Sequence, residues 1–330
     1  MLFEILDPKQ KCKNIYSQNR IIANPPYEKL SKTWAYHPTL KDYDIGYASI
    51  YAQAKTLEEC CPEDTRAEWD HVKKKYLAYI KSFNVAQCEI GDECFYDLVP
   101  QSFVLEYFRI KNKITEHVLE TYPRPPNYDF FVELADLLAS IREHPLDIDL
   151  TQMVSKMHET KTRGFYSRLQ TSSRIVDYNM FGTITGRLTT KKNSFPLLTL
   201  NKDYRSVVRP TNTWFIELDF NAAELRCLLA LNEQPQPEKD MHEWHGSIFN
   251  KLSDHSLARD DIKRKIFGWL YGPLDASLGI PQIEKHYDKR KILNKYWDGS
   301  KVTNPFGRTV PADEFHALNA IIQSTTSDTF

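Results

Sequence analysis

One segment constrains the fold of this chain of 330 residues more than any other: TWFIELDF, residues 213–220. Its aromatic and β-branched side chains and its short length are typical of a buried β-strand. A run with helical spacing, AELRCLLAL (223–231), follows it directly. A buried strand that leads into a helix predicts a core of the α/β or α+β class, in which a sheet packs against helices.

Helical patterns dominate the first half of the sequence. Amphipathic spacing predicts helices over residues 66–83, 101–120 and 129–142. The run TYPRPPNY (121–128) separates the last two, because proline lacks an amide donor and disfavours helix at the residue before it. Residues 1–100 show no pattern that indicates a function.

Composition excludes several classes of protein. Aromatic residues make up 12% of the chain, too many for a protein that buries nothing, so disorder is excluded as the main state. No apolar run approaches the roughly 18 residues that a membrane helix needs, and the N-terminus MLFEILDPKQ lacks the pattern of a secretory signal. The six cysteines match no zinc spacing such as CxxC, which favours reduced thiols. We therefore expect a cytoplasmic protein without a membrane partner.

Two basic stretches stand out in a chain whose net charge is only −1. Residues 155–210 hold 11 Lys and Arg against 3 Asp and Glu, and residues 259–308 hold 11 against 6. Such local excess is typical of a site for a polyanion. A solvated lysine-rich surface would give the same counts, so charge alone leaves both interpretations open.

The segment LARDDIKRKIFGWLYG (257–272) is the second strong helical pattern. Arg259, Lys263, Phe267 and Tyr271 follow one another at intervals of four, so they lie along one side of the predicted helix. Two cations and two rings suit a triphosphate and a base, because cations neutralise phosphate oxygens and rings stack on bases. The same pattern also fits an ordinary amphipathic helix with core rings and solvated cations.

Asp219 stands near the end of the predicted strand, five residues before Glu224. An acid at this place can hold a divalent cation, since carboxylate oxygens are the ligands that Mg²⁺ prefers. It can equally cap the following helix by accepting a hydrogen bond from a free amide. The position alone does not choose between a metal ligand and a cap.

Five segments resemble motifs of the family A DNA polymerases, the bacterial polymerase I type, and occur in that family's order. TGRLTT (185–190) resembles TGRLSS, and DFNAAELR (219–226) resembles DYSxxELR. DMHEWHGSIF (240–249) is similar to the family's DIH segment, and RDDIKRKIFGWLYG (259–272) matches RxxxKxxxFGxxYG at every defining position. NAIIQSTTSD (319–328) resembles NAxxQGTAAD.

The resemblance implies an α+β right-hand polymerase fold with thumb, palm and fingers, rich in helix. It implies a helical thumb-like region at 101–174, a palm at 175–254 and fingers at 255–312. Residues 313–330 would begin the return to the palm, whose sheet would be incomplete at the C-terminus. Residues 1–100 are left as an N-terminal region of unknown role.

The resemblance also implies an activity: template-directed DNA synthesis, in which deoxynucleotides are added to a primer 3′-OH by two-metal phosphoryl transfer. Asp219 matches one of two carboxylates that bind the catalytic Mg²⁺ ions, which clamp the attacking and leaving oxygens. Phe220 would lend its backbone carbonyl to a metal. Lys263 would be catalytic as a proton donor to the departing pyrophosphate. The implied partners are primer–template DNA, deoxynucleoside triphosphates and Mg²⁺.

The remaining matches imply roles in binding. Glu224 would act as a gate that crowds a ribose 2′-OH and so favours deoxynucleotides. The residues that match ligands of the incoming nucleotide are His242, Arg259, Lys263, Phe267 and Tyr271, besides Glu224. The residues that match contacts to primer–template DNA are Arg187, Asn319 and Gln323.

The sequence departs from the family pattern near these residues. Asn221 and Ala222 replace the usual Ser and Gln, and the loss of Gln would weaken a polar contact near the template or primer. FPLLTL (195–200) stands where PNLQNIP is usual. Phe315 occupies a place where the family often has Arg, with His316 beside it.

The family's third motif is a His-Asp-Glu turn with the second metal-binding carboxylate, and it should follow Gln323 by a few dozen residues. The sequence ends at Phe330 without it. We therefore expect the N-terminal part of a truncated or split polymerase, with a second polypeptide supplying the missing motif. We expect the chain alone to be inactive, because one carboxylate does not hold two Mg²⁺ ions in the required geometry.

No 3′–5′ exonuclease motif is recognisable before the thumb-like region, so we expect no proofreading. A compact polymerase of this kind would suit a phage. The protein would then lie in the cytoplasm of the host.

Two alternatives stand beside the polymerase. The first is a catalytically inactive DNA- or partner-binding protein derived from one, which would not need Asp219, Glu224 and Lys263 together; the presence of all three favours the enzyme. The second is a zinc site at His242 and His245. Their spacing is i and i+3 rather than the i and i+4 of HExxH, which argues against it.

Overall fold

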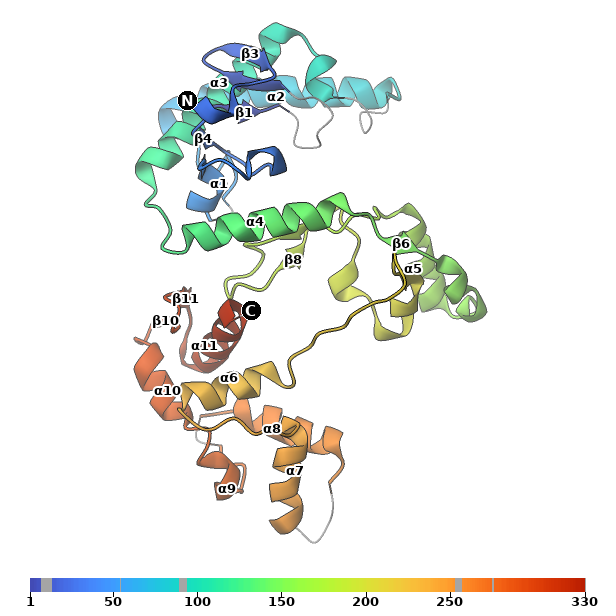
Figure 1. Cartoon of the computed structure of the whole chain (residues 1–330), viewed down its shortest axis with the longest axis vertical. Helices are drawn as coiled ribbons and strands as arrows, with labels where there is room; N and C mark the ends of the chain where they lie inside the picture. The colour runs from blue at the N-terminus through green and yellow to red at the C-terminus, as the bar shows by residue number, and fades with distance from the viewer. Residues whose placement is uncertain (7–13, 54, 89–93, 253–256, 275, 330) are drawn as a thin grey trace. The chain divides into compact units, whose positions relative to one another are not determined.

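The computed structural model describes residues 1–6, 14–53, 55–88, 94–252, 257–274 and 276–329. The chain divides into two compact units (Figure 1). Unit 1 comprises Met1–Met180 and Thr190–Arg209, and unit 2 comprises Phe181–Thr189 and Pro210–Phe330. Both units contain helices and short strands, which confirms the α+β class.

Unit 1 begins with a three-stranded antiparallel sheet of β1 (Glu4–Ile5), β2 (Asn14–Ser17) and β3 (Arg20–Ala23). Gln18 and Asn19 connect β2 to β3 with φ angles of 50° and 60°. This is the left-handed geometry of a two-residue hairpin turn, whose twist matches that of the strands it joins.

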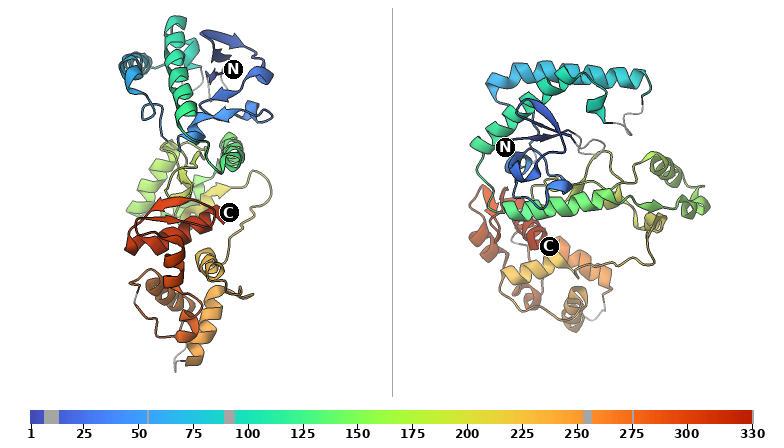
Figure 2. Two further views of the ribbon diagram at one scale, coloured as in Figure 1. Left: turned by 90° about the vertical axis from the view of Figure 1, so that its left-hand side faces the viewer. Right: turned by 45° about the horizontal axis from the view of Figure 1, so that its top comes forward.

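Long helices complete unit 1 and confirm the helices predicted over 66–83, 101–120 and 129–142. The helices of this unit are α1 (Ala48–Tyr51), α2 (Glu63–Val85), α3 (Gln101–Thr121), α4 (Tyr128–Glu143) and α5 (Thr160–Thr171). α3 lies between α2 and the β1–β3 sheet (Figure 2). Its first residue follows Pro100, and its face toward the core includes Phe108 and Ile114.

Short strand pairs and 3-10 helices link the longer elements. β4 (Lys32–Thr33) pairs in parallel with β5 (Gly46–Tyr47), and β6 (Asp147–Ile148) pairs antiparallel with β9 (Val208–Arg209). The other two-residue strands are β7 (Tyr178–Asn179) and β8 (Thr189–Thr190). The 3-10 helices are η1 (Tyr27–Lys29), η2 (Pro38–Leu40), η3 (Phe95–Asp97), η4 (Leu150–Lys156), η5 (Leu197–Thr199) and η6 (Lys202–Val207).

Unit 2 is mainly helical, and it confirms the helices predicted at 223–231 and 257–272. Its elements are α6 (Ala223–Leu231), α7 (Met241–Leu252), α8 (Arg259–Leu270), α9 (Pro281–Glu284), α10 (Lys289–Tyr296), the hairpin strands β10 (Lys301–Thr303) and β11 (Thr309–Pro311), and α11 (Glu314–Thr329). α11 packs against α6 and α10, and α7 packs against α8. Leu228, Ile266 and Ile321 are buried in the one core that these helices share.

The strand predicted at 213–220 is wrong. That segment forms neither strand nor helix, and all its residues are exposed, including Ile216 at 84% and Leu218 at 90%. No strand among the described residues pairs with it. Without a partner its backbone lacks the ladder of hydrogen bonds that stabilises a buried strand, and β-propensity alone does not replace that ladder.

Two further findings bear on the predictions about membrane helices and about the cysteines. None of the helices in the described ranges is long and apolar enough to cross a membrane. Cys60, Cys61, Cys88 and Cys227 are free thiols, as predicted. Cys94 is bonded in a disulfide, so the prediction of reduced cysteines is wrong for that residue.

Candidate functional site

The residues singled out by the sequence all belong to unit 2. Arg187 lies in the segment Phe181–Thr189, and Glu224 lies in the first turn of α6. His242 lies in the first turn of α7. α8 carries Arg259, Lys263 and Phe267, with Tyr271 at its C-cap, and α11 carries Asn319 and Gln323.

Glu224 joins three of these residues. Its Oε1 accepts a hydrogen bond from Arg187 Nη2 at 2.5 Å, and its Oε2 accepts one from the Tyr271 hydroxyl at 2.5 Å. Burial raises the pKa of Tyr271 well above its usual range, and the bond to Glu224 raises it further. Tyr271 is therefore a neutral donor at physiological pH, and it holds the carboxylate of Glu224 in one orientation.

The two rings predicted on one side of α8 do lie together. Phe267 and Tyr271 stack with centroids 5.9 Å apart and planes inclined by 24°. The His242 ring lies 6.2 Å from Phe267 at 49°. Both rings on α8 are half-buried, so each keeps accessible surface while it packs. The spacing of four residues accounts for this contact, because such residues are neighbours on a helix surface.

Asp240 organises the start of α7, although the sequence reasoning assigned it no role. Its Oδ1 accepts the amides of His242 at 2.9 Å and Glu243 at 3.0 Å, which makes it the cap of that helix. Its Oδ2 accepts Arg259 Nη2 at 2.9 Å and also Asn221 Nδ2. Burial raises the pKa of Asp240, but these donors together lower it well below its usual range. The sequence did contain a signal for this cap, because an aspartate stands directly before a run with helical spacing.

Asn221 is the second residue that the sequence reasoning undervalued. Besides its bond to Asp240, its Oδ1 accepts the Met241 amide at 2.9 Å. Its own backbone carbonyl accepts Arg226 Nε at 2.9 Å. Asn221 thus links the segment before α6 to the start of α7.

His242 is buried, with 4% of its surface exposed. Within the described ranges its Nδ1 has no hydrogen-bond partner. Burial lowers the pKa of His242, and the nearby positive charge of Arg259 lowers it further. The imidazole is therefore mostly neutral at pH 7.

Arg259 and Lys263 present positive charge on α8. Arg259 remains 53% exposed while it pairs with Asp240. Lys263 is exposed one turn later and forms no ion pair within the described part of the chain. The stripe of two cations and two rings predicted from spacing is therefore present on α8.

Asn319 and Gln323 face a cavity of about 610 Å³ in unit 2, which Thr185 and His316 also line. A second cavity of about 560 Å³ is lined by Tyr271 and again by Asn319. Asn319 Oδ1 is buried and has no hydrogen-bond partner among the described residues. A buried polar atom without a partner beside two cavities is able to accept a hydrogen bond from a ligand.

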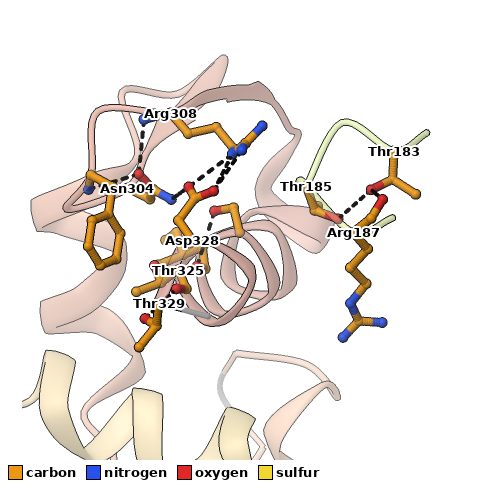
Figure 3. Close-up of polar contacts among 11 residues, drawn as sticks. Thr183, Thr185, Arg187, Asn304, Arg308, Thr325, Asp328 and Thr329 are labelled. Carbon is orange, nitrogen blue, oxygen red and sulfur yellow. Dashed lines mark hydrogen bonds and ion pairs between the residues drawn. The ribbon is translucent and has the colours of Figure 1, made fainter. Parts of the chain in front are cut away.

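The TGR segment lies against Arg308, whose guanidinium pairs with Asp328 near the end of α11. Arg308 forms a two-pronged ion pair with Asp328, with Nε to Oδ2 at 2.9 Å and Nη2 to Oδ1 at 2.6 Å, and Asn304 Nδ2 donates to Asp328 Oδ2 at 2.7 Å (Figure 3). Gly186 has a φ of +87°, and a Cβ there would lie 2.8 Å from Arg308 Nη2. Glycine is required at this turn by both its backbone angle and its neighbour.

Figure 3 also shows how Arg187 is presented. Thr183 Oγ1 donates to the Arg187 carbonyl at 3.0 Å, which closes the turn around Gly186. The Arg187 side chain extends from this turn to its carboxylate partner and stays half-exposed. Sequence reasoning named Arg187 but missed Arg308 and Asp328, because their pairing joins positions 20 residues apart.

Asp219 takes no part in these contacts, and Phe220 lines a separate cavity of about 460 Å³ beside α6. Asp219 is exposed and forms no ion pair within the described residues. In those residues no group of three or more His, Cys, Asp or Glu side chains could hold a metal ion. Ala222, directly before α6, has left-handed angles of φ 51° and ψ 52°, which an alanine adopts at a cost of about 1 kcal/mol.

The zinc alternative finds no support. His245 is fully buried, and its Nε2 lies 2.9 Å from the Tyr287 hydroxyl, so that nitrogen already has a hydrogen-bond partner. Burial lowers the pKa of His245 to about 4. It is a neutral core residue.

A scan against models of protein families and a search of curated proteins find no match for this sequence. Function is therefore inferred from the site itself. The site combines exposed cations, accessible rings, a fixed carboxylate and buried acceptors. Such groups suit a ligand that is both anionic and aromatic.

Proposed function

We propose that this chain takes part in template-directed DNA synthesis, in which a deoxynucleotide is added to a primer 3′-OH by phosphoryl transfer. One observation carries the proposal: a continuous line of contacts runs from Arg187 through Glu224, Tyr271 and Phe267 to His242. These residues come from separate segments that resemble separate motifs of family A polymerases. Their meeting in one place supports a shared role.

The cations of α8 would bind the triphosphate. Arg259 is oriented by Asp240 but stays half-exposed, so its remaining donors can reach phosphate oxygens. Lys263, exposed and unpaired within the described residues, adds a second charge one turn away. The rings of Phe267 and Tyr271 would then face the sugar and base.

Glu224 would exclude ribonucleotides. Two hydrogen bonds hold its carboxylate, one from Arg187 and one from Tyr271. A carboxylate held at both oxygens cannot swing away from an added 2′-OH, so a ribose would meet steric crowding. This role would explain why both oxygens of the carboxylate are held by hydrogen bonds.

Mg²⁺ is the cofactor of this proposal. Asp219 and the Phe220 carbonyl would hold it, and they supply only part of the oxygen set, which waters and phosphates complete at many Mg²⁺ sites. When bound, Mg²⁺ would neutralise charge on the phosphates during transfer. A second acidic ligand, which these residues do not supply, would complete the site.

Nucleotide binding by the full chain tests the proposal. We expect dATP with Mg²⁺ to bind in isothermal titration calorimetry, and Lys263→Ala to weaken binding by about tenfold, since a charge-assisted hydrogen bond contributes about 1.5–3 kcal/mol. Lys265→Ala is the matched control: it removes an exposed lysine from the opposite side of the same helix. Equal loss in both variants, or no binding by the wild type, would contradict the proposal.

A second candidate function is favoured by one observation. Asp219 stands exposed, and the described residues contain no group of three or more His, Cys, Asp or Glu side chains that could hold a metal ion. This suits a DNA-binding protein that has lost catalysis. Two results together would support this second function: primer–template binding that Asp219→Ala leaves unchanged, and no binding of nucleotide.

A further inference from the structure

Small side chains on one side of α6 leave an open space among the helices of unit 2. Ala223, Cys227 and Ala230 follow one another at intervals of four and three, so they lie on the same side of the helix. The bulky Leu225 and Leu228 are buried in the core that α6 shares with the other helices. The side with the small residues therefore does not fill the space toward α10 and the end of α11.

This space is a cavity of about 460 Å³, within the range of roughly 300–1,000 Å³ that is typical of small-molecule sites. Three aromatic rings line it, those of Phe220, Tyr296 and Phe306. Phe220 is 62% exposed and Phe306 is 48% exposed, so both rings keep accessible surface. Such rings can pack against another ring in an offset or edge-to-face arrangement. The lining of the cavity therefore suits an aromatic molecule.

The end of α11 adds two hydroxyl groups to this lining, those of Thr325 and Thr326. Thr325 is only 6% exposed, and it lies near Thr329 at the end of the helix (Figure 3). Both hydroxyl oxygens are buried, and neither forms a hydrogen bond within the described ranges. The Cys227 thiol lies close to both, but a thiol is a weak donor and acceptor. Because buried hydroxyls without partners are unfavourable, a ligand that bonds to them would gain affinity.

The charged groups around the cavity already have partners in the chain. Arg226 forms five hydrogen bonds, three of them to backbone carbonyls at 2.9–3.1 Å. The Glu233 carboxylate lies 3.6 Å from Lys291 Nζ and 3.9 Å from Lys295 Nζ. Burial raises the pKa of the Cys227 thiol, which is therefore neutral at pH 7. A charged ligand would lose its hydration without gaining an unpaired counter-charge, so a neutral ligand is favoured.

We propose that the cavity beside α6 binds a small, neutral aromatic molecule that carries one hydroxyl group, that is, a ligand of the phenol class. The side chains of Phe220, Tyr296 and Phe306 contact its ring. Its hydroxyl donates to one of the two buried hydroxyls, Thr325 or Thr326, and accepts from the other, since a phenolic O–H does both. This inference goes beyond the proposed function and does not depend on it.

Three related compounds test the predicted chemistry by isothermal titration calorimetry with the full chain. 2-Naphthol is the probe, naphthalene lacks its hydroxyl, and 2-naphthoate carries a negative charge. We expect 2-naphthol to bind at one site and naphthalene to bind about fivefold more weakly, because it forms no hydrogen bond. 2-Naphthoate should bind at least about tenfold more weakly, because its charge finds no free partner. No binding of 2-naphthol, or equal binding of 2-naphthoate, would contradict the proposal.

Variants of the chain locate the site. Ala230→Trp should abolish binding of 2-naphthol, because the new ring occupies the cavity, whereas Ala78→Trp should not, because Ala78 is an exposed alanine on α2 of unit 1. Thr325→Val should weaken 2-naphthol about fivefold and change naphthalene by less than about twofold, since only the phenol uses the hydroxyl. Full binding in Ala230→Trp, or equal losses of both compounds in Thr325→Val, would overturn the proposal.

Protection of Cys227 locates the ligand without any substitution. Methyl methanethiosulfonate converts a thiol into its methyl disulfide and releases methanesulfinate, and mass spectrometry measures the rate at each cysteine. 2-Naphthol should slow the reaction of Cys227, which lines the cavity, but not that of Cys88, which is exposed in unit 1. An unchanged rate at Cys227 would refute the site. A thiol of Cys227 that is protected without ligand and becomes reactive on dilution would make a second copy the occupant and would also overturn the proposal.

Discussion

Glu224 shows how much of the site depends on single side chains. Its two oxygens bind one donor each, from Arg187 and Tyr271, which are 84 positions apart in the sequence. The motif resemblance named all three residues. It did not show that they bind one another, because hydrogen bonds between distant positions leave no local pattern.

Substitution of Glu224 tests its proposed role in sugar selection. Glu224→Ala should bring the dissociation constants of ATP and dATP about tenfold closer, a change of about 1.4 kcal/mol, because the crowding of a 2′-OH is removed. Calorimetry with each nucleotide and primer–template measures it. Tyr271→Phe, which keeps the carboxylate, should change this ratio less. An unaltered ratio in Glu224→Ala would refute the gate.

A substitution at Gly186 tests how closely the TGR turn packs against Arg308. Gly186→Ala should lower the free energy of unfolding by about 1 kcal/mol or more, because the φ of +87° is strained for alanine and the new Cβ meets a guanidinium held by Asp328. Gly268→Ala on α8 is the opposite case: nothing lies within 4 Å of its new Cβ, so it should stabilise by about 0.5–1 kcal/mol. Urea denaturation measures both. Equal effects would contradict the assigned geometry.

The lowered pKa of His245 predicts that the stability of the folded protein depends on pH. Its pKa is 6.5 when exposed and about 4 in the folded protein, so below pH 6.5 the unfolded chain binds a proton that the folded chain does not. The stability present above pH 6.5 is therefore lost as the pH falls toward 4, by up to about 3 kcal/mol.

The matched variant for this pH effect is His245→Gln, which can keep a hydrogen bond to Tyr287. His242 and His286 have lowered pKa values of the same sign, so the difference between wild type and variant isolates His245. Urea denaturation at pH 7 and pH 4 should show the larger loss in the wild type. Parallel losses would contradict the buried neutral state of His245.

At the scale of elements, helices were predictable and the central strand was not. α2, α3, α4, α6 and α8 follow from apolar spacing with prolines at their borders, since a helix makes its hydrogen bonds within itself. A strand needs a partner, and the pattern of residues 213–220 carries no information about whether one is present. For the same reason, the sequence did not predict the strands β1–β3, β10 and β11.

The cap of α7 gives a prediction at this scale. Asp240→Ala should lower the free energy of unfolding by about 1–2 kcal/mol, because the first amides of α7 lose their acceptor. Asp240→Asn should lower it much less, since asparagine caps as well. Both variants should weaken dATP binding, because Arg259 loses its charged partner. Equal stability of the two variants would argue against capping.

At the scale of the whole molecule, local sequence patterns did not predict that the chain divides into two units. Unit 1 takes in residues 1–100, which sequence reasoning left without a role, together with the predicted thumb-like helices. Glu4 illustrates the reason: it is buried, accepts a hydrogen bond from Thr115 at 2.7 Å, and so ties the first strand to α3 across 111 positions. Phe181–Thr189 belongs to unit 2 although both of its neighbours in sequence belong to unit 1.

The proposed function requires that this chain binds a deoxynucleotide under the direction of a template. The most direct test is the affinity of each of the four deoxynucleotides for the full chain with Mg²⁺ and a primer–template whose primer ends in a dideoxynucleotide. We expect tighter binding of the nucleotide complementary to the next template base, a preference that changes when that base changes and that Lys263→Ala weakens. Equal affinity for all four nucleotides, whatever the template base, would contradict the claim.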